Sequence, residues 1–487
     1  MVNSSNLTKG HIVYFVGEVL SKAIFFVLLP FLGNSISISE FGVFSLLFPL
    51  IQYLLSTASF GLSTSLFRYF FEKDVSKDAV FSSTLLSWLL SAICWYPIFF
   101  LLLYSTPISQ YHLYKYHLSN FVAPLLISLL CLGFGQIVTE LFRVQKKATL
   151  FVILNFFSRF IIVIALLITV YLGYLSSISL LWATATGSII VFTYSLIIYL
   201  MNLKFSIDWV LVKKLTYFGY PVMLTPISAL FLYLGNRYVL NYLVSADEVG
   251  IYSMAVSLVQ IVALIPAAFS RAWVPELFSR LSEGTADESF FKKIVSHYLF
   301  VFIFFCLSFE LCSKMILLAV GGVKYLSALP LFPILLSGFI LEVYYTFSID
   351  RLCYAKRMPL VFLLSTFSGV FNVIISFATI MLFGKIGAAL AFTVSILIQA
   401  ILFAVAAQKI DRIRLPHKEL LCYVLLGIIG CNLIWYALNL GTWAGAIGIY
   451  FIMMMILVFL FKQDYVTTKK IMLLEPFPLV DKGFQDV

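Results

Sequence analysis

The chain has 487 residues, of which 62% are hydrophobic and 11% are charged, and its formal net charge is +10. This composition excludes a soluble globular domain and indicates an integral membrane protein. The positive charge does not indicate nucleic-acid binding, because the cations are concentrated on one side of the predicted membrane spans.

Fourteen apolar stretches follow one another along the chain, and each is at least about 20 residues long, enough to cross about 30 Å of hydrocarbon. If the amino terminus is cytoplasmic, the inner connections and span ends hold 25 of the 32 Lys and Arg residues and the outer ones hold four. The positive-inside rule then predicts an even number of spans with both termini in the cytoplasm. The predicted spans are residues 10–33, 41–66, 79–103, 118–141, 148–172, 178–202, 215–241, 248–270, 294–319, 327–350, 358–383, 386–408, 419–438 and 442–461.

The connections between the spans are short. The longest outer connection, residues 104–117, and the longest inner one, residues 271–293, leave no room for a folded extramembrane domain. A membrane polymerase or glycosyltransferase usually presents its catalytic side chains on a sizeable loop, so we expect no enzyme activity. The sequence has no P-loop, dinucleotide motif or catalytic triad signature, and its seven cysteines lack metal or redox spacing. We therefore expect no cofactor and no metal site.

The sequence contains an internal repeat. Residues 40–45 at the start of span 2 resemble residues 248–253 at the start of span 8, and residues 50–52 resemble residues 258–260 at the same offset of 208. A chance likeness between two helix N-termini is the alternative. Because six spans separate the copies, both halves have the same orientation, as in a parallel repeat. We predict an all-α membrane protein with two six-helix bundles and an additional helix pair, divided as 1–205, 206–410, 411–465 and a cytoplasmic tail, 466–487.

Two such bundles suggest alternating access around a central cleft near the bilayer midplane. Pro221 and Pro226 interrupt span 7 and predict a kinked, movable helix there. Ordinary packing between membrane helices is the alternative explanation.

Several charged residues fall within the predicted spans, where each costs about 3 kcal/mol or more unless it faces a bundle interior or a wet cavity. Lys22, Arg159 and Arg237 would make a cleft electropositive and suit the oxygens of an anionic group. The alternative is structural: Lys22 can pair with Glu18 on the same helix face, and Arg237 can reach the outer interface. Glu18, Glu310 and Glu342 are candidate proton or sodium sites if transport is driven by an ion gradient.

Three short motifs carry a resemblance to a known family. They are Glu40-Phe41-Gly42 at the start of span 2, the segment from Gly61-Leu62 to Leu66-Phe67-Arg68-Tyr69-Phe70 at its inner end, and Val249-Gly250-Ile251-Tyr252-Ser253-Met254-Ala255 at the start of span 8. With the repeat and the charge pattern, they make the chain resemble the bacterial Wzx-type polysaccharide flippases, which translocate O-antigen and capsule repeat units. That family belongs to the multidrug/oligosaccharidyl-lipid/polysaccharide exporter superfamily, together with MATE drug exporters and lipid II flippases.

The resemblance implies a MATE-like fold in the bacterial inner membrane. It implies that the protein flips an oligosaccharide linked to undecaprenyl pyrophosphate from the cytoplasmic to the outer leaflet, for O-antigen, capsule or exopolysaccharide export. Lys22 and Arg159 would engage the pyrophosphate, with Arg237 and Arg68 as lesser candidates. Family members often place an acid before the arginine late in span 7, whereas this chain has Asn236. The implied partners are the lipid-linked oligosaccharide, membrane lipids, and the polymerase and chain-length proteins of polysaccharide assembly.

Two further functions compete with this one. A cation-coupled multidrug exporter on the same fold would need an acidic cleft, whereas the embedded charges here balance. A membrane polymerase or ligase is disfavoured by the short outer connections.

Overall fold

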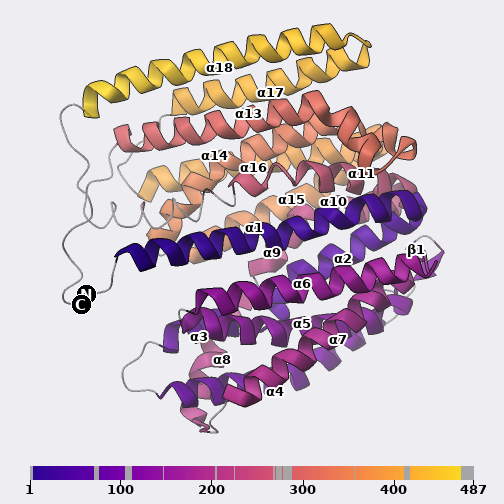
Figure 1. Ribbon diagram of the computed structural model, residues 1–487, viewed down its shortest axis with the longest axis vertical. Helices are drawn as coiled ribbons and strands as arrows, with labels where there is room; N and C mark the ends of the chain where they lie inside the picture. Colours follow the sequence, from indigo (N-terminus) through magenta and orange to yellow (C-terminus); the bar gives the residue numbers. More distant parts are fainter. Residues whose placement is uncertain are drawn as a thin grey trace.

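The helices of the computed structural model run side by side along one direction (Figure 1). The structure describes residues 4–70, 76–104, 112–113, 115–145, 147–202, 206–223, 225–266, 269, 277, 288–355, 357–410 and 417–472. α1 begins and α18 ends at one end of the molecule, called here the inner end, and the β1–β2 hairpin lies at the opposite, outer end (Figure 1).

The first half of the chain forms seven helices and one short hairpin. These are α1 (Ser4–Ser35), α2 (Ile38–Ala58), α3 (Leu62–Phe70), α4 (Lys77–Tyr104), β1 (His112–Leu113), β2 (Tyr116–His117), α5 (Ser119–Val144), α6 (Ala148–Tyr171) and α7 (Ser177–Asn202). Within this half α5 packs against α7, and α1 packs against α6.

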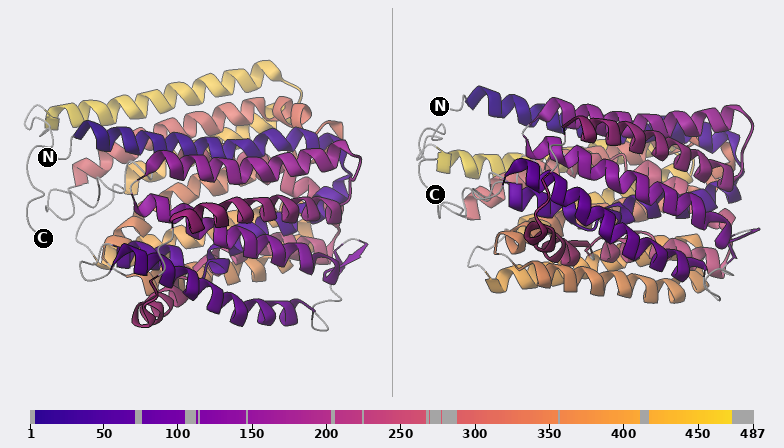
Figure 2. Two further views of the ribbon diagram at one scale, coloured as in Figure 1. Left: turned by 60° about the horizontal axis from the view of Figure 1, so that its bottom comes forward. Right: turned by 90° about the horizontal axis from the view of Figure 1, so that it is seen from below.

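The second half begins with three short helices and continues with longer ones. The described elements are α8 (Trp209–Met223), α9 (Thr225–Tyr233), α10 (Gly235–Leu243), α11 (Ala246–Val259), α13 (Glu288–Val320), the 3₁₀-helix η2 (Val323–Ala328), α14 (Leu331–Tyr354), α15 (Met358–Phe383), α16 (Lys385–Ile410), α17 (His417–Asn439) and α18 (Trp443–Met472). The packing of α14 against α16 and of α15 against α16 is extensive, and α17 and α18 lie along α13 (Figure 2).

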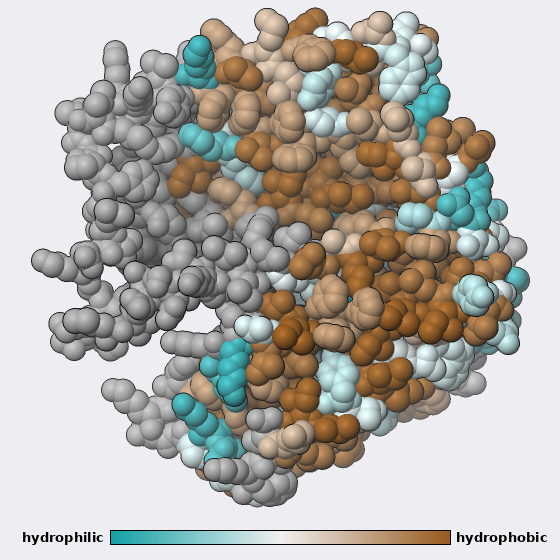
Figure 3. Space-filling view, in the orientation of Figure 1, coloured by the Kyte–Doolittle hydropathy of each residue, from teal (hydrophilic) through white to brown (hydrophobic). Residues whose placement is uncertain are grey.

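The helices confirm a multi-pass membrane protein. Twelve helices in the described part are long and apolar enough to cross a membrane, and α1 contributes a shorter apolar stretch, Ala23–Ser35. Span 7 is divided among three helices that are each too short to be counted this way. The number of 14 spans therefore stays a prediction. Apolar residues cover most of the described surface seen in Figure 3, as contact with lipid requires.

Span 2 is not the single helix that its sequence predicts, because it breaks between α2 and α3. Phe60 has a φ of 53° and Gly61 a φ of 64°, a left-handed conformation that a helix cannot contain. At this break the chain meets α8: a Cβ on Gly61 would lie 2.2 Å from the carbonyl oxygen of Gly219. Only glycine permits two backbones to approach so closely.

Span 7 is interrupted at Leu234, which separates α9 from α10. α8 ends at Met223 and α9 begins at Thr225; residue 224, between Pro221 and Pro226, lies outside the described residues, so the kink predicted at these prolines stays a prediction. α8 packs against α3 and α4 of the first repeat, whereas α9 and α10 pack against α15. One span thus contacts both halves of the molecule.

The predicted repeat is confirmed by equivalent contacts at the starts of α2 and α11. The hydroxyl of Ser37 accepts a hydrogen bond from the N–H of Glu40 at 3.3 Å. The hydroxyl of Ser245 accepts one from the N–H of Glu248 at the same distance of 3.3 Å. A serine followed three residues later by glutamate is the pattern of a capping box.

Each of these glutamates also binds the start of the last helix in its own repeat. Glu40 accepts a hydrogen bond from the N–H of Ser177 at 2.7 Å, and Glu248 accepts one from the ammonium group of Lys385 at 3.0 Å. Both pairs are separated by 137 residues. Equivalent positions in the two halves therefore make equivalent contacts.

α2 and α11 also contact each other reciprocally near the outer end. A Cβ on Gly42 would lie 2.1 Å from the carbonyl oxygen of Ala246, and one on Gly250 would lie 2.2 Å from that of Ile38. Such paired contacts are what a two-fold axis produces.

Other bonds close the outer end between the halves. Ser39 donates a hydrogen bond to Asp247, and the ammonium group of Lys324 donates to the carbonyl oxygen of Ile36 at 2.6 Å. In this conformation the outer ends of the two repeats are therefore held together.

Candidate functional site

Spans 2 and 7 form a long antiparallel contact between the two repeats. Near the inner end, the hydroxyl of Ser65 donates to the carbonyl oxygen of Leu215 at 2.8 Å. At the end of α2, the hydroxyl of Thr57 donates to the carbonyl oxygen of Met223 at 3.0 Å. These bonds attach α8 to the first repeat and leave α9 and α10 to line the outer part of the same interface.

Arg237 lies in this outer part and is 5% exposed. Its Nη1 donates to the carbonyl oxygen of Ser45 on α2 at 3.1 Å, and its guanidinium carbon lies 5.9 Å from the ring centroid of Tyr252. Nε has no partner among the described residues, and no described carboxylate forms an ion pair with the side chain. The alternative that Arg237 reaches the outer interface is wrong, because packing against α2 and α11 buries it.

Asn236 takes no part in balancing this charge. Its amide nitrogen donates to the hydroxyl of Tyr252 at 2.7 Å and to the carbonyl oxygen of Ala388 at 3.1 Å. A buried cation without an anion costs free energy, which a carbonyl and an aromatic ring offset only in part. An anionic partner for Arg237 would lower this cost.

Glu342 of α14 lies beside the same interface, because Tyr233 links it to Tyr53 of α2. Its Oε1 accepts hydrogen bonds from the hydroxyls of Tyr233 at 2.8 Å and Tyr345 at 3.5 Å. Its Oε2 has no partner among the described residues, and the side chain is partly exposed. The ring of Tyr233 stacks on that of Tyr53 from α2, with centroids 5.9 Å apart and planes inclined by 11°. Glu342 thus has one buried oxygen without a described partner, beside the contact between the repeats.

Arg159 is partly exposed halfway along α6, and no described acid forms an ion pair with it. α6 lies close against α1, since a Cβ on Gly17 would be 2.2 Å from Cγ1 of Val152. Both helices run outward from the inner end (Figure 1). Lys22 lies five residues beyond Gly17 and Arg159 lies seven beyond Val152. At 1.5 Å per residue, their backbones therefore differ in depth by about 3 Å. The structure therefore brings the helices of these two predicted residues together. The side chains of Lys22 and Glu18 lie outside the described residues.

Arg68 lies apart from this group. It is exposed on α3, near the inner end, with its guanidinium carbon 5.2 Å from the ring centroid of Phe218 and 5.9 Å from that of Tyr69. Because Arg237 contacts the outer part of α2, the two arginines cannot hold one phosphate group together in this conformation.

Glu310 is fully buried on α13, and neither of its carboxyl oxygens has a partner among the described residues. It lies near the thiols of Cys306 and Cys431, on the side of α13 that packs against α17. Ionising an isolated carboxyl in such surroundings costs several kcal/mol. Of the predicted acids Glu310 and Glu342, both have buried carboxyl oxygens, but only Glu342 has described hydrogen-bond partners.

The tyrosines around Glu342 were missed from the sequence. Tyr345 lies three residues after Glu342, on the same helix face, and this spacing was a readable signal. Tyr53 and Tyr233 come from other helices, and no pattern in the sequence links them to the acid.

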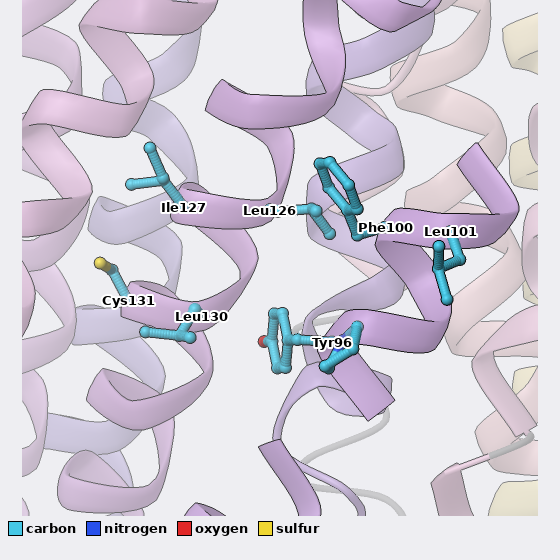
Figure 4. Close-up of a pocket in the computed structure, with 8 residues that line it drawn as sticks. Tyr96, Phe100, Leu101, Leu126, Ile127, Leu130 and Cys131 are labelled. Carbon is cyan, nitrogen blue, oxygen red and sulfur yellow. The ribbon is translucent and has the colours of Figure 1, made fainter. Parts of the chain in front are cut away.

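An apolar groove lies between α4 and α5, apart from the charged residues described above. It measures about 560 Å³ and is lined by apolar side chains such as Phe100, Leu101 and Leu126, with Tyr96 at one side (Figure 4). None of the charged residues predicted from the sequence lines it. This groove suits hydrocarbon chains and not a charged ligand.

Two parallel helical repeats with a broken span at their interface define a class of multi-pass membrane proteins with a MATE-like fold. The sequence matches the family of polysaccharide biosynthesis proteins over residues 7–282, more than half of its length, and the chain belongs to that family. No curated protein sequence matches the chain.

Solved structures show the same fold at low sequence identity. The lipid II flippase MurJ in an inward closed conformation is 15% identical, with a TM-score of 0.67 over 93% of this chain and 100% of that one. An inward-facing MATE family multidrug transporter of the MOP superfamily is 14% identical, with a TM-score of 0.65 over 80% of this chain and 94% of that one. The MATE multidrug transporter DinF-BH is 16% identical, with a TM-score of 0.59 over 84% of this chain and 96% of that one.

Proposed function

We propose that the protein is a flippase and not an enzyme, and that it moves an oligosaccharide linked to undecaprenyl pyrophosphate from the cytoplasmic to the outer leaflet of the bacterial inner membrane. The observation that carries this proposal is Arg237, a buried cation without a described anionic partner at the contact between the two repeats. A pyrophosphate supplies the missing negative charge, and a guanidinium binds phosphate oxygens through paired hydrogen bonds.

Arg159 and Lys22 extend the cationic path. Their helices lie side by side at similar depth, so a pyrophosphate that leaves Arg237 can meet them within the first repeat. The polyprenyl chain stays in hydrocarbon, and the groove between α4 and α5 is one apolar surface open to such a chain. Membrane lipids, the polymerase and the chain-length proteins of polysaccharide assembly are the partners that this role implies.

Glu342 is the proposed site of ion coupling. Its free Oε2 and the two hydroxyls on Oε1 present oxygen atoms, which suit a proton or a sodium ion. A gradient of either ion would then drive the change between conformations. With the inner end of the molecule in the cytoplasm, as the cation distribution predicts, the closed outer end corresponds to the state that accepts substrate from inside.

One observation favours a multidrug exporter as the second candidate. Glu342 with its ring of tyrosines is also a fitting site for an organic cation, through charge and cation–π contacts. The two functions differ in which charge binds the cargo: Arg237 for a lipid-linked oligosaccharide, Glu342 for a cationic drug.

The test is to delete the gene and measure the polyprenyl-linked intermediates of the cell by mass spectrometry. The flippase predicts accumulation of one complete oligosaccharide-pyrophosphate-lipid, which disappears on complementation with the wild-type gene and persists with Arg237→Met. An unchanged lipid pool with heightened sensitivity to cationic drugs would refute the flippase and support the exporter.

A further inference from the structure

Four tyrosines from four helices surround the carboxyl group of Glu342. Tyr233 of α9 and Tyr345 of α14 donate hydrogen bonds to it, and Tyr53 of α2 and Tyr298 of α13 lie close enough to interact with its charge. No described Lys or Arg forms an ion pair with this acid. Tyr53 lies close enough to interact with the charges of both Arg237 and Glu342.

Tyr233 differs from the other three because it is bound to both repeats. Its hydroxyl donates to Glu342 at 2.8 Å, within the second repeat, and its ring stacks on Tyr53 of the first repeat at 5.9 Å. Phe392 of α16 contacts the same ring at 5.8 Å. The hydrogen bond fixes the hydroxyl, and the stack requires the ring to be nearly parallel to Tyr53. A change at the carboxyl group can therefore reach α2 through this side chain.

We propose that Tyr233 is a positioning residue that couples the charge of Glu342 to the contact between α2 and α9. When Glu342 is ionised, it accepts a charge-assisted hydrogen bond from the hydroxyl of Tyr233, and the ring lies against Tyr53. When a proton or a sodium ion neutralises the carboxylate, the hydroxyl loses a strong acceptor and the stack across the repeats loosens. Spans 2 and 7 then separate at mid-depth. This inference rests on the proposed function, because it assigns a regulatory role to the acid proposed for ion coupling.

A double-mutant cycle on the purified full-length protein in lipid nanodiscs tests the inference at a single pH. Hydrogen–deuterium exchange is followed by mass spectrometry in peptides that cover α2 and α9. Glu342→Gln mimics the neutral acid and removes the charge, whereas Tyr233→Phe keeps the ring and removes the hydroxyl. Each variant is expected to raise exchange in α2 by about tenfold, the effect of losing one hydrogen bond to a charged group. Because both act through one bond, the double variant should exchange no faster than either single variant.

Two further variants serve as controls. Tyr345→Phe removes the longer bond, which lies within α14, and should exchange like the wild-type protein in α2. Tyr53→Leu removes the stack and should raise exchange in α2 while abolishing the response to Glu342→Gln. Additive effects of Glu342→Gln and Tyr233→Phe, or wild-type exchange in Tyr233→Phe, would overturn the inference.

The exchange measurement contains no lipid-linked substrate, so its outcome is independent of the flippase assay. If the lipid pool of the deletion strain is unchanged but the cycle shows coupling, the proposed cargo is wrong and the role of Tyr233 stands. If the lipid accumulates but the cycle is additive, the flippase stands and Tyr233 has only a packing role.

Discussion

A single methyl group at Gly42 should disrupt the contact that closes the outer end. In Gly42→Ala, the new Cβ would lie 2.1 Å from the carbonyl oxygen of Ala246, so α2 and α11 must move apart by about 1 Å to reach an ordinary van der Waals distance. Overpacking of this kind costs about 1–3 kcal/mol. Because the cost falls only on the closed outer end, the ratio of closed to open molecules should fall by about 5- to 150-fold.

Gly250→Ala tests the equivalent contact in the second repeat, and Gly448→Ala serves as a control. A Cβ on Gly250 would lie 2.2 Å from the carbonyl oxygen of Ile38, whereas one on Gly448 has nothing within 4 Å. Gly448→Ala should stabilise α18 by about 0.5–1 kcal/mol through helix propensity alone. The midpoint temperature of unfolding, measured by tryptophan fluorescence, should therefore fall for Gly42→Ala and Gly250→Ala and rise for Gly448→Ala. Equal shifts at Gly42 and Gly448 would refute the close contact of α2 with α11.

Three other predictions concern charged residues. Arg237→Met should abolish export. Its thermal stability should equal or exceed that of the wild type, because the change removes a buried charge without a described anion. A large loss of stability would instead make Arg237 a structural residue. Arg159→Ala should stop export at normal expression and Arg159→Lys should restore part of it, whereas wild-type surface glycan in Arg159→Ala would exclude a role in binding. At the outer surface, the hydrogen bond to Glu40 raises the pKa of Lys115. Because folding raises the pKa of Lys115, its bond to Glu40 stabilises the folded protein at every pH below the ordinary lysine pKa. This stabilisation is lost as the pH rises through the raised pKa. Lys115→Met should therefore lower the melting temperature at neutral pH and match the wild type at strongly alkaline pH.

The sequence was sufficient for the fold because the bilayer leaves few choices. A long apolar stretch must form a helix, since hydrocarbon offers no partner to an exposed peptide group. The repeat was visible because residues 40–45 and 248–253 resemble each other at a fixed offset, and the same geometry at two helix starts needs similar residues. Pro221 and Pro226 predict an interruption of span 7 for an equally local reason: proline cannot complete a helical hydrogen bond.

The break in span 2 was not visible. Phe60 adopts a conformation that its own side chain disfavours, and the contact of Gly61 with Gly219, in another helix, accompanies it. A hydropathy pattern cannot report such a contact, because it depends on which helices become neighbours.

By itself, the sequence determined the class of protein, its repeat and which charged residues enter the membrane, since these follow from local composition and spacing. Only the tertiary structure decided which of those charges could act on a ligand. It buried Arg237 beside α2 without a described anion, enclosed Glu310 within α13 and α17, and left Glu342 partly exposed under Tyr233. The reason is physical: the free energy of a charge in a membrane depends on the partners that other helices bring to it, and those helices are distant in sequence.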